Sequence, residues 1–195
     1  MEKAKAVIAS NNRKKLEEMK YILGEKGFEL LSLEDIGFSG EIEETGSTFE
    51  ENALIKARRI AEFSGMPAIS DDSGLVVDAL GGEPGVYSAR YGGDSCKSDR
   101  QRYELLLKNM AGVKNRSARF VSCIACVDPV SGRVITAEGS CEGEIAEAPS
   151  GDGGFGYDPV FIAASLGRTM AEISPEEKNK ISHRARAIEE FAKKL

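Results

Sequence analysis

Two adjacent carboxylates, Asp71 and Asp72, stand between two short apolar runs, and this arrangement restricts the fold more than any other stretch of the chain. Residues 66–69 and 75–77 have the composition of buried strands, and the Ser, Asp and Gly residues between them are turn formers. We therefore expect a tight turn over Ser70–Gly74, held at both ends. Most such turns are structural. However, adjacent carboxylates flanked by apolar strands repel each other unless a cation, usually a metal ion, joins them, so a metal site is the alternative. The other motifs of the chain decide between the two.

Length and charge set the class of protein. With 195 residues, the chain is long enough for one medium domain, or one domain with two lobes, around a sizeable core. Its formal net charge of -6 argues against proteins that hold long nucleic acid through phosphate contacts, because those present a basic face. A local cluster of Lys and Arg can still bind a small anion within an acidic protein.

The N-terminal stretch and the cysteines predict a cytoplasmic protein. The apolar run Ala6–Ala9 is too short for a signal peptide or a membrane span, so we expect no membrane partner. The four cysteines come without other signs of secretion, which predicts a reducing compartment. Cys123 and Cys126 have the spacing of a redox or zinc pair, but positions three apart in a strand point to opposite faces, so we interpret them as structural thiols.

A strand followed by a polar turn and a helix is predicted at the start of the chain. Residues 4–9 have the pattern of a buried strand, and apolar residues then recur at helical spacing. The helix start, with its free N–H groups and positive dipole end, favours a phosphate, although a solvated basic turn has the same pattern. The candidate phosphate-binding residues are Ser10, Asn11, Asn12, Arg13, Lys14 and Lys15.

An acidic turn precedes the best-marked helix of the sequence. Thr48 and Glu51 have the spacing of a capping box, and Gly65 is placed to end the helix. Lys56 falls near the edge of the apolar stripe, where a lone lysine is usually solvated. The acidic turn, Glu41–Gly46, is a solvated loop or a source of an extra carboxylate for a divalent ion.

The middle of the chain has the pattern of a scaffold. Ser98 is expected to cap a helix that runs to about Met110. Strands are predicted over 118–127 and 133–147, joined by a hairpin turn at Asp128–Gly132.

Two further motifs lie near the C-terminus. Residues 151–159 contain four glycines around Phe155 and Tyr157. This pattern predicts either a loop whose aromatic rings stack on a ligand or a tight loop whose rings enter the core. Ser174–Glu177 is a capping box with proline at the first helical position, which places Lys178 in the first turns of a helix. His183 and Arg184 are expected to open the last helix, where they form a polar clamp or, as is usual for a lone histidine, His183 has a structural role.

Taken together, these motifs resemble the inosine triphosphate pyrophosphatase family. Five motifs occur in the same order as in the family and cover nearly the whole chain, so the probability of a chance match is very small. They are Ser10-x-Asn12-x-x-Lys15, residues 48–53 with Lys56, residues 71–75, residues 153–159, and residues 177–179 with 181–184.

The resemblance implies a mixed α/β fold in which an extended, twisted sheet with flanking helices forms two lobes around a central nucleotide cleft. Residues 1–195 would form this single domain, and the protein would be a homodimer. The implied reaction is hydrolysis of ITP, dITP and XTP to the monophosphate and pyrophosphate, with water attacking the α-phosphorus in the presence of Mg²⁺. The purine nucleoside triphosphate is then the substrate, and no nucleic acid is bound.

The resemblance also implies a role for each motif. Asp72 would be the catalytic base or water-orienting residue, with Asp71 in assistance, and Glu44 and Asp72 would hold Mg²⁺, with Glu43 as an alternative to Glu44. The triphosphate would contact Ser10–Lys15, Lys56 and Ser73. The base and sugar would contact Phe155, Gly156, Tyr157, Asp158, Lys178, His183 and Arg184.

Three rival functions follow from the same residues. One is a pyrophosphatase for modified pyrimidine triphosphates, and another is a nucleotide-sensing protein without turnover. A Ser-His-Asp hydrolase built on Ser73 is the weakest, because Ser73 lacks a Gly-x-Ser-x-Gly elbow.

Overall fold

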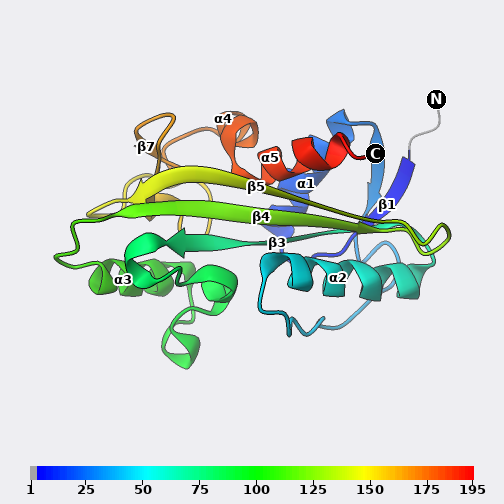
Figure 1. Cartoon of the computed structure of the whole chain (residues 1–195), viewed down its shortest axis with the longest axis horizontal. Helices are drawn as coiled ribbons and strands as arrows, with labels where there is room; N and C mark the ends of the chain where they lie inside the picture. Colours follow the sequence, from blue (N-terminus) through cyan, green and yellow to red (C-terminus); the bar gives the residue numbers. More distant parts are fainter. Residues whose placement is uncertain (1–3) are drawn as a thin grey trace. The chain divides into compact units, whose positions relative to one another are not determined.

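A computed structural model describes residues 4–195, which contain a mixed seven-stranded sheet with flanking helices (Figure 1). The strand order is β2-β1-β3-β4-β5-β6-β7, and the pairing is parallel between β1 and its neighbours and antiparallel from β5 to β7. The predicted mixed α/β class is therefore confirmed. The strands are β1 (Ala4–Ile8), β2 (Phe28–Leu31), β3 (Ala68–Val77), β4 (Ser117–Val127), β5 (Val134–Ile145), β6 (Phe161–Ala163) and β7 (Arg168–Thr169).

Five α-helices and four short 3₁₀ helices are present in the described part of the chain. The α-helices are α1 (Arg13–Glu25), α2 (Phe49–Ser64), α3 (Asp99–Asn109), α4 (Pro175–Ile181) and α5 (His183–Ala192). The 3₁₀ helices are η1 (Asp78–Leu80), η2 (Gly85–Arg90), η3 (Gly93–Ser95) and η4 (Asp158–Val160). None of the helices within residues 4–195 combines the length and apolar character that a membrane span needs.

Local sequence signals fix most helix ends. Both predicted capping boxes are present, from Thr48 to Glu51 at α2 and from Ser174 to Glu177 at α4. Gly65 ends α2 in the left-handed conformation, with φ of 67°. The helix predicted after Ser98 and the hairpin of β4 and β5 are also confirmed.

The chain divides into two compact units. Unit 1 comprises residues up to 72, 122–139 and 184–195, and unit 2 comprises residues 73–121 and 140–183. Strands β3, β4 and β5 each contribute residues to both units.

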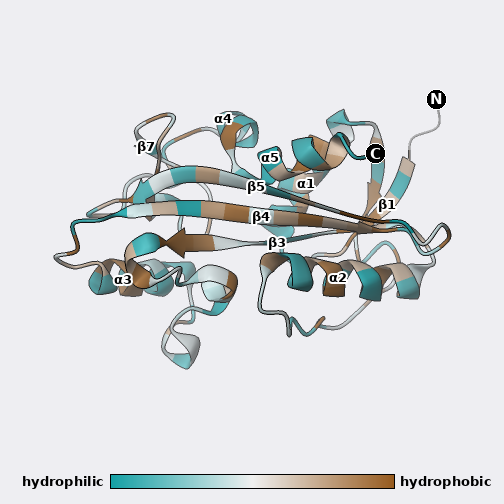
Figure 2. Ribbon diagram, in the orientation of Figure 1, coloured by the Kyte–Doolittle hydropathy of each residue, from teal (hydrophilic) through white to brown (hydrophobic). Residues whose placement is uncertain are grey.

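In unit 1, helices cover both faces of the strands, which explains why these strands are apolar on both sides (Figures 1 and 2). Helices α1 and α5 pack on one face, where the core includes Ile69 of β3 and Ile124 of β4. Helix α2 packs on the other face, against Ala68 of β3 and Ala125 of β4. Unit 2 has its own core, which includes Leu75, Leu106, Phe120, Tyr157 and Phe161.

The expected turn over Ser70–Gly74 is wrong, because these residues lie inside β3, a single strand of ten residues. Side chains alternate between the two faces of a strand, so Asp71 shares the face of Ile69 and Asp72 shares the face of Ala68. The two neighbouring carboxylates therefore point to opposite sides of the sheet, and no single cation is needed to join them. Their composition resembled a turn, but separate long-range partners on each face allow them to lie within a buried strand.

Candidate active site

Asp71 is buried on the α1 and α5 face of unit 1 and is surrounded by groups that stabilise its negative charge. One oxygen, Oδ2, lies 2.9 Å from Nζ of Lys15 and 3.0 Å from Nη2 of Arg184. Ser122 donates to the other oxygen, Oδ1, at 2.5 Å. Burial alone would raise the pKa of Asp71, but the charges of Arg184 and Lys15 and the hydrogen bond from Ser122 hold it well below its usual value. Asp71 is thus a fixed anion.

The two cations around Asp71 come from helix starts. Lys15 lies in the first turn of α1, where Asn12 caps the helix by accepting from the backbone N–H groups of Lys14 and Lys15 at 3.1 Å. Burial lowers the pKa of Lys15, and the charge of Asp71 opposes this shift. Arg184 lies at the start of α5, is fully buried, and also forms an ion pair with Glu18 of α1. A buried guanidinium with two carboxylate partners is held in a fixed orientation.

Asp72 occupies the opposite face, where Lys56 of α2 forms a bridge between two carboxylates. Nζ of Lys56 lies 3.1 Å from Oδ1 of Asp72 and 2.5 Å from Oε1 of Glu44. Burial raises the pKa of Asp72, although Lys56 and Lys15 partly oppose the shift. Burial would lower the pKa of Lys56, but Asp72 and Glu44 outweigh it and the pKa is raised. Lys56 is therefore not the solvated lysine that its position in the helix pattern suggested.

The Glu44 and Asp72 pair has the chemistry that a divalent cation needs. Both carboxylates lie within hydrogen-bond distance of the same nitrogen, so their oxygens converge on one region. Oδ2 of Asp72 is buried and has no hydrogen-bond partner among residues 4–195. Among those residues, no group of three or more His, Cys, Asp or Glu side chains could hold a metal ion. Two carboxylates with water and phosphate oxygens suit Mg²⁺, which rarely has an all-protein site.

The other residues of the first motif lie before and at the start of α1, where residues 11–14 are exposed and Ser10 is partly buried. Ser10 accepts from the backbone N–H of Asn12 at 3.2 Å, and the amide of Asn11 donates to the carbonyl of Gly40 at the same distance. Arg13 extends into solvent and pairs with Glu17 one turn along the helix. Lys14 is also exposed. The side chain of Lys15 reaches the buried cluster around Asp71.

In unit 2, the glycine-rich loop is held in one conformation by specific contacts. Asp158 is buried, accepts from the backbone N–H of Phe155 at 2.8 Å, and forms an ion pair with Lys178 at 2.7 Å. Nζ of Lys178 also lies 4.5 Å from the ring centroid of Phe155. Gly154 has φ of 71°, and a Cβ there would lie 2.0 Å from Oδ2 of Asp158, so no other residue fits.

The two aromatic residues of this loop differ. Phe155 is partly exposed, which leaves its ring accessible for stacking. Tyr157 is buried in the core of unit 2 and donates from its hydroxyl to the carbonyl of Ser88 at 2.8 Å. The interpretation of Tyr157 as a stacking face is therefore wrong, and the alternative of a core position holds. Gly156 follows Phe155 and donates its N–H to Asp99 at 2.9 Å.

His183 and Ser73 are the other predicted residues of unit 2. The imidazole of His183 stacks on Phe120, with ring centroids 4.9 Å apart and planes 17° from parallel. Ser73 is partly buried in β3, directly after the aspartate pair. The predicted residues thus form two groups. Unit 1 contains Ser10–Lys15, Glu44, Lys56, Asp71, Asp72 and Arg184. Unit 2 contains Ser73, Phe155–Asp158, Lys178 and His183.

Two residues that contact Asp71 or its partners were missed by the sequence analysis. Ser122 interrupts the apolar run of β4, which was the available signal, but nothing local indicates that its partner is Asp71. Glu18 lies one turn after Lys15 on α1, so its position on the same side of the helix was visible in the spacing. Its partner Arg184 is 166 residues away in the chain.

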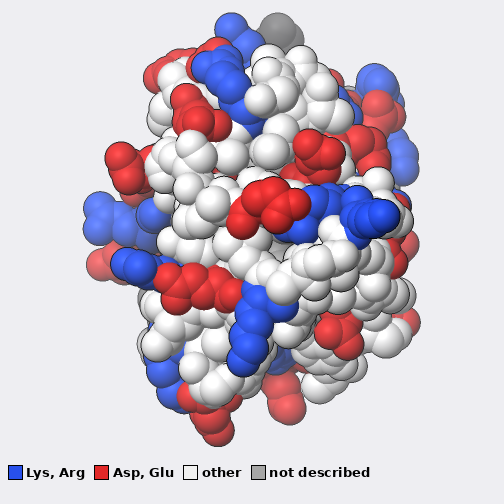
Figure 3. Space-filling model, turned by 90° about the vertical axis from the view of Figure 1, so that its left-hand side faces the viewer, with Lys and Arg blue, Asp and Glu red and all other residues white. Residues whose placement is uncertain are grey.

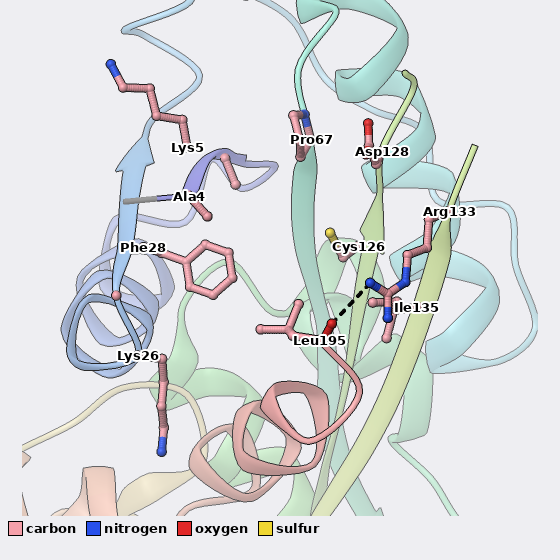
Figure 4. A pocket seen from close by; sticks show the side chains of 12 residues that line it. Ala4, Lys5, Lys26, Phe28, Pro67, Cys126, Asp128, Arg133, Ile135 and Leu195 are labelled. Atoms are coloured by element: carbon pink, nitrogen blue, oxygen red, sulfur yellow. Dashed lines mark hydrogen bonds between the residues drawn. The ribbon is translucent and has the colours of Figure 1, made fainter. Parts of the chain in front are cut away.

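A cavity of about 310 Å³ lies elsewhere in unit 1 and is a poor candidate for the reaction (Figure 4). Phe28, Pro67 and Ile135 contribute to its largely apolar lining. Arg133 at its edge donates to the carbonyl of Leu195 at 3.2 Å. Burial raises the pKa of Cys126 to about 11, so this thiol in the lining is neutral and unreactive near pH 7. Cys123 is likewise free, with a pKa raised by burial to about 12, as expected of a structural thiol.

One face of the molecule carries charges of both signs. On the face drawn in Figure 3, Lys and Arg alternate with Asp and Glu, and that face has no continuous basic stripe.

Comparisons with known proteins give the family. The model of the Ham1 family matches residues 6–194. The chain belongs to the Ham1 family. Two relatives named dITP/XTP pyrophosphatase, from Bacillus licheniformis and Bacillus subtilis, are 52% and 49% identical to it. The alignments cover 95% of both chains for the first, and 97% of this chain and 96% of the relative for the second.

Solved structures of the Ham1 family have the same fold. The Ham1 protein of Staphylococcus aureus matches with a TM-score of 0.87 and 42% identity over 98% of this chain and 97% of that one. The HAM1 protein of Coxiella burnetii matches with a TM-score of 0.88 and 42% identity over 98% of each chain. Similarity to the whole length of these chains confirms the resemblance that the five motifs predicted.

Proposed function

We propose that this protein hydrolyses non-standard purine nucleoside triphosphates, dITP, XTP and ITP, to the monophosphate and pyrophosphate. Relatives about half identical over nearly the whole chain carry the name dITP/XTP pyrophosphatase, which supports the substrate class. The structural observation that carries the proposal is Asp72. It is buried beside Lys56 and Glu44, has a raised pKa, and keeps one oxygen without a hydrogen-bond partner among residues 4–195. Such a carboxylate can bind a cation and orient or deprotonate water.

Glu44 and Asp72 would hold a divalent ion, which we take to be Mg²⁺. When bound, such an ion lowers the pKa of a bound water and neutralises charge on the phosphate oxygens. The protein's own residues then have separate tasks. Asp72 orients the attacking water and accepts its proton, and Lys56 binds phosphate oxygens and limits repulsion between the two carboxylates. Lys15 and the capped start of α1, with Ser10–Lys14, hold the triphosphate.

Asp71 has a different task from the one that the family resemblance suggested. Its carboxylate points to the other face of β3 and is saturated by Lys15, Arg184 and Ser122. We assign to it the orientation of Lys15 and Arg184 rather than assistance in proton transfer. Ser73, the next residue after the pair, is a further candidate for a phosphate contact.

The loop of unit 2 would recognise the base and sugar. Phe155 offers its ring for stacking, and Lys178 and Asp158 hold that ring in place. The predicted set is completed by Gly156, Tyr157, His183 and Arg184. Tyr157 would act indirectly, by holding the loop in shape from its position in the core. Donors aimed at the 6-keto oxygen of hypoxanthine or xanthine would be left unpaired by the 6-amino group of adenine. One such mismatch discriminates by roughly ten- to a thousandfold.

The setting of this activity is also part of the proposal. We infer a cytoplasmic homodimer, because the family resemblance implies a dimer and the cysteines are free. The two-lobed nucleotide cleft and the role of residues 1–195 as one catalytic domain stay predictions of the resemblance.

A substrate panel with a pyrophosphate readout tests the function. We expect Mg²⁺-dependent release of pyrophosphate from dITP, XTP and ITP, with much slower release from dATP, dGTP and dTTP. Release from dTTP or UTP derivatives in preference to ITP would favour the pyrimidine alternative. Binding of ITP without release would favour a nucleotide-sensing protein.

A further inference from the structure

Asn52, in the second turn of α2, has a polar side chain that the packing of unit 1 does not explain. It is completely buried among the alanines of the helix's inner face. Its Nδ2 has no hydrogen-bond partner among the described residues. A buried donor without a partner lowers stability, and an apolar side chain of the same size would avoid that cost. The residue therefore needs a reason other than packing.

The other end of the amide has a specific partner. Oδ1 of Asn52 accepts from the backbone N–H of Gly46 at 2.8 Å, which also settles which atom of the amide is the oxygen. Gly46 lies so close to the helix that a Cβ there would be 2.6 Å from Cβ of Glu51 and 2.7 Å from Oδ1 of Asn52. The acidic turn is thus held directly against α2, in the coil that precedes this helix in Figure 1.

The start of α2 does not depend on this bond. The side chain of Thr48 caps the helix, and Glu51 accepts from the backbone N–H groups of Ser47 and Thr48. These contacts form the capping box without help from Asn52. What the bond from Gly46 does determine is the path of the residues before the cap, including Glu44 two positions earlier.

Glu44 is also held by a residue on the face of α2 that carries Asn52. Lys56 lies one turn after Asn52, and its Nζ contacts Oε1 of Glu44 at 2.5 Å. That contact depends on charge, so a divalent ion at Glu44 and Asp72 must compete with it. The bond from Gly46 to Asn52 is between neutral groups and does not change when the charges are rearranged.

We propose that Asn52 is the positioning residue for Glu44, holding the acidic turn in place independently of Lys56 so that the carboxylate is preorganised for a divalent cation. This rests on the proposed role of Glu44 as a metal ligand. Asn52 itself touches neither metal nor substrate in this assignment. Asn52 would strengthen metal binding by fixing the conformation of the acidic turn. A metal ligand that is already in position loses less conformational entropy when the metal binds.

Two variants remove the contact from opposite sides. Asn52→Ala deletes the acceptor, and Gly46→Ala places a methyl group against the helix. Ser64→Ala is the matched control, because it removes the side-chain hydrogen bonds of Ser64 at the other end of α2.

The first readout is amide hydrogen exchange in the free protein, without metal or nucleotide. We expect exchange over residues 41–47 to become about fivefold faster in Asn52→Ala and Gly46→Ala. Ser64→Ala should leave exchange over this segment unchanged. If Asn52→Ala does not fold, Gly46→Ala decides the question by itself.

The second readout is metal affinity, measured with Mn²⁺ alone by electron paramagnetic resonance and with Mg²⁺ in pyrophosphate release from ITP. Both disrupting variants should need about fivefold more metal for half-saturation, with kcat at saturating Mg²⁺ within about twofold of the wild type. Unchanged exchange over 41–47, or unchanged metal affinity in folded variants, overturns the assignment. If the wild type releases no pyrophosphate, the proposed function fails, and the exchange and Mn²⁺ results still decide the role of Asn52.

Discussion

Asp71 and Asp72 are covalent neighbours with opposite surroundings. Asp71 faces α1 and α5, where two cations and a hydroxyl surround it, and its pKa is held low. Asp72 faces α2, where it shares one lysine with a second carboxylate and has a raised pKa. One of its oxygens has no hydrogen-bond partner in the described part of the chain. Two carboxylates pushed apart in pKa commonly have separate tasks. This difference supports our proposal that Asp71 has a structural role and that Asp72 has the catalytic one.

The largest expected effect separates the two by activity. In Asp72→Asn, the amide can neither accept a proton nor bind a cation strongly, so kcat for pyrophosphate release should fall about a thousandfold. The free energy of unfolding should stay the same or rise, because the environment of Asp72 disfavours its charged form. Steady-state kinetics and urea denaturation measure the two quantities. Near-normal turnover in this variant would remove Asp72 from the catalytic role.

The reverse pattern is expected for Asp71→Asn. Loss of this carboxylate leaves Lys15 and Arg184 buried with less compensation, and breaking a buried ion pair costs about 3–5 kcal/mol. Urea denaturation should show this loss. Asp94→Asn, at an exposed carboxylate paired with Lys97, is the control and should unfold like the wild type. A folded Asp71→Asn protein of normal stability would contradict the comparison.

The pH dependence of stability tests the same assignment more finely. The pKa of Asp71 is lower in the folded protein than in the unfolded chain, where it is about 3.9. Its contribution is therefore complete above that unfolded value and is lost as the pH falls toward the folded pKa. Between pH 5 and 3, the free energy of unfolding should fall more steeply in the wild type than in Asp71→Asn. Equal slopes would show that Asp71 is not held as an anion.

Ser122 gives the smallest of these effects. Ser122→Ala removes one hydrogen bond to Asp71 and should lower the free energy of unfolding by about 1 kcal/mol. The same substitution in the Asp71→Asn background should cost less, because its partner has already changed. A double-mutant cycle by urea denaturation measures this coupling. Additive losses would mean that Ser122 stabilises the protein without acting through Asp71.

Sequence reasoning succeeded where the signal is local. The capping boxes at Thr48 and Ser174 and the left-handed end at Gly65 depend on residues within one turn, and each was predictable. The short strands β2, β6 and β7 were not predicted, because two to four residues carry too little pattern.

The aspartate pair shows where such reasoning fails. Asp-Asp-Ser-Gly favours a turn locally, but Lys15, Lys56 and Arg184 stabilise the carboxylates inside a strand. These partners lie 56, 16 and 113 residues from the carboxylates they contact, so the spacing of residues could not reveal them. The family resemblance supplied the residues of the site, whereas the separation of the two acids onto opposite faces came from the structure.

The alternation along β3 also limits how this stretch can evolve. An insertion or deletion of one codon between Pro67 and Asp71 would turn both acids to the wrong side, presenting Asp71 to Lys56 and Asp72 to Arg184. Point substitutions in flanking positions leave that orientation intact. The length of the chain from Pro67 to Asp72 is therefore a stricter requirement than the identity of the apolar residues within it.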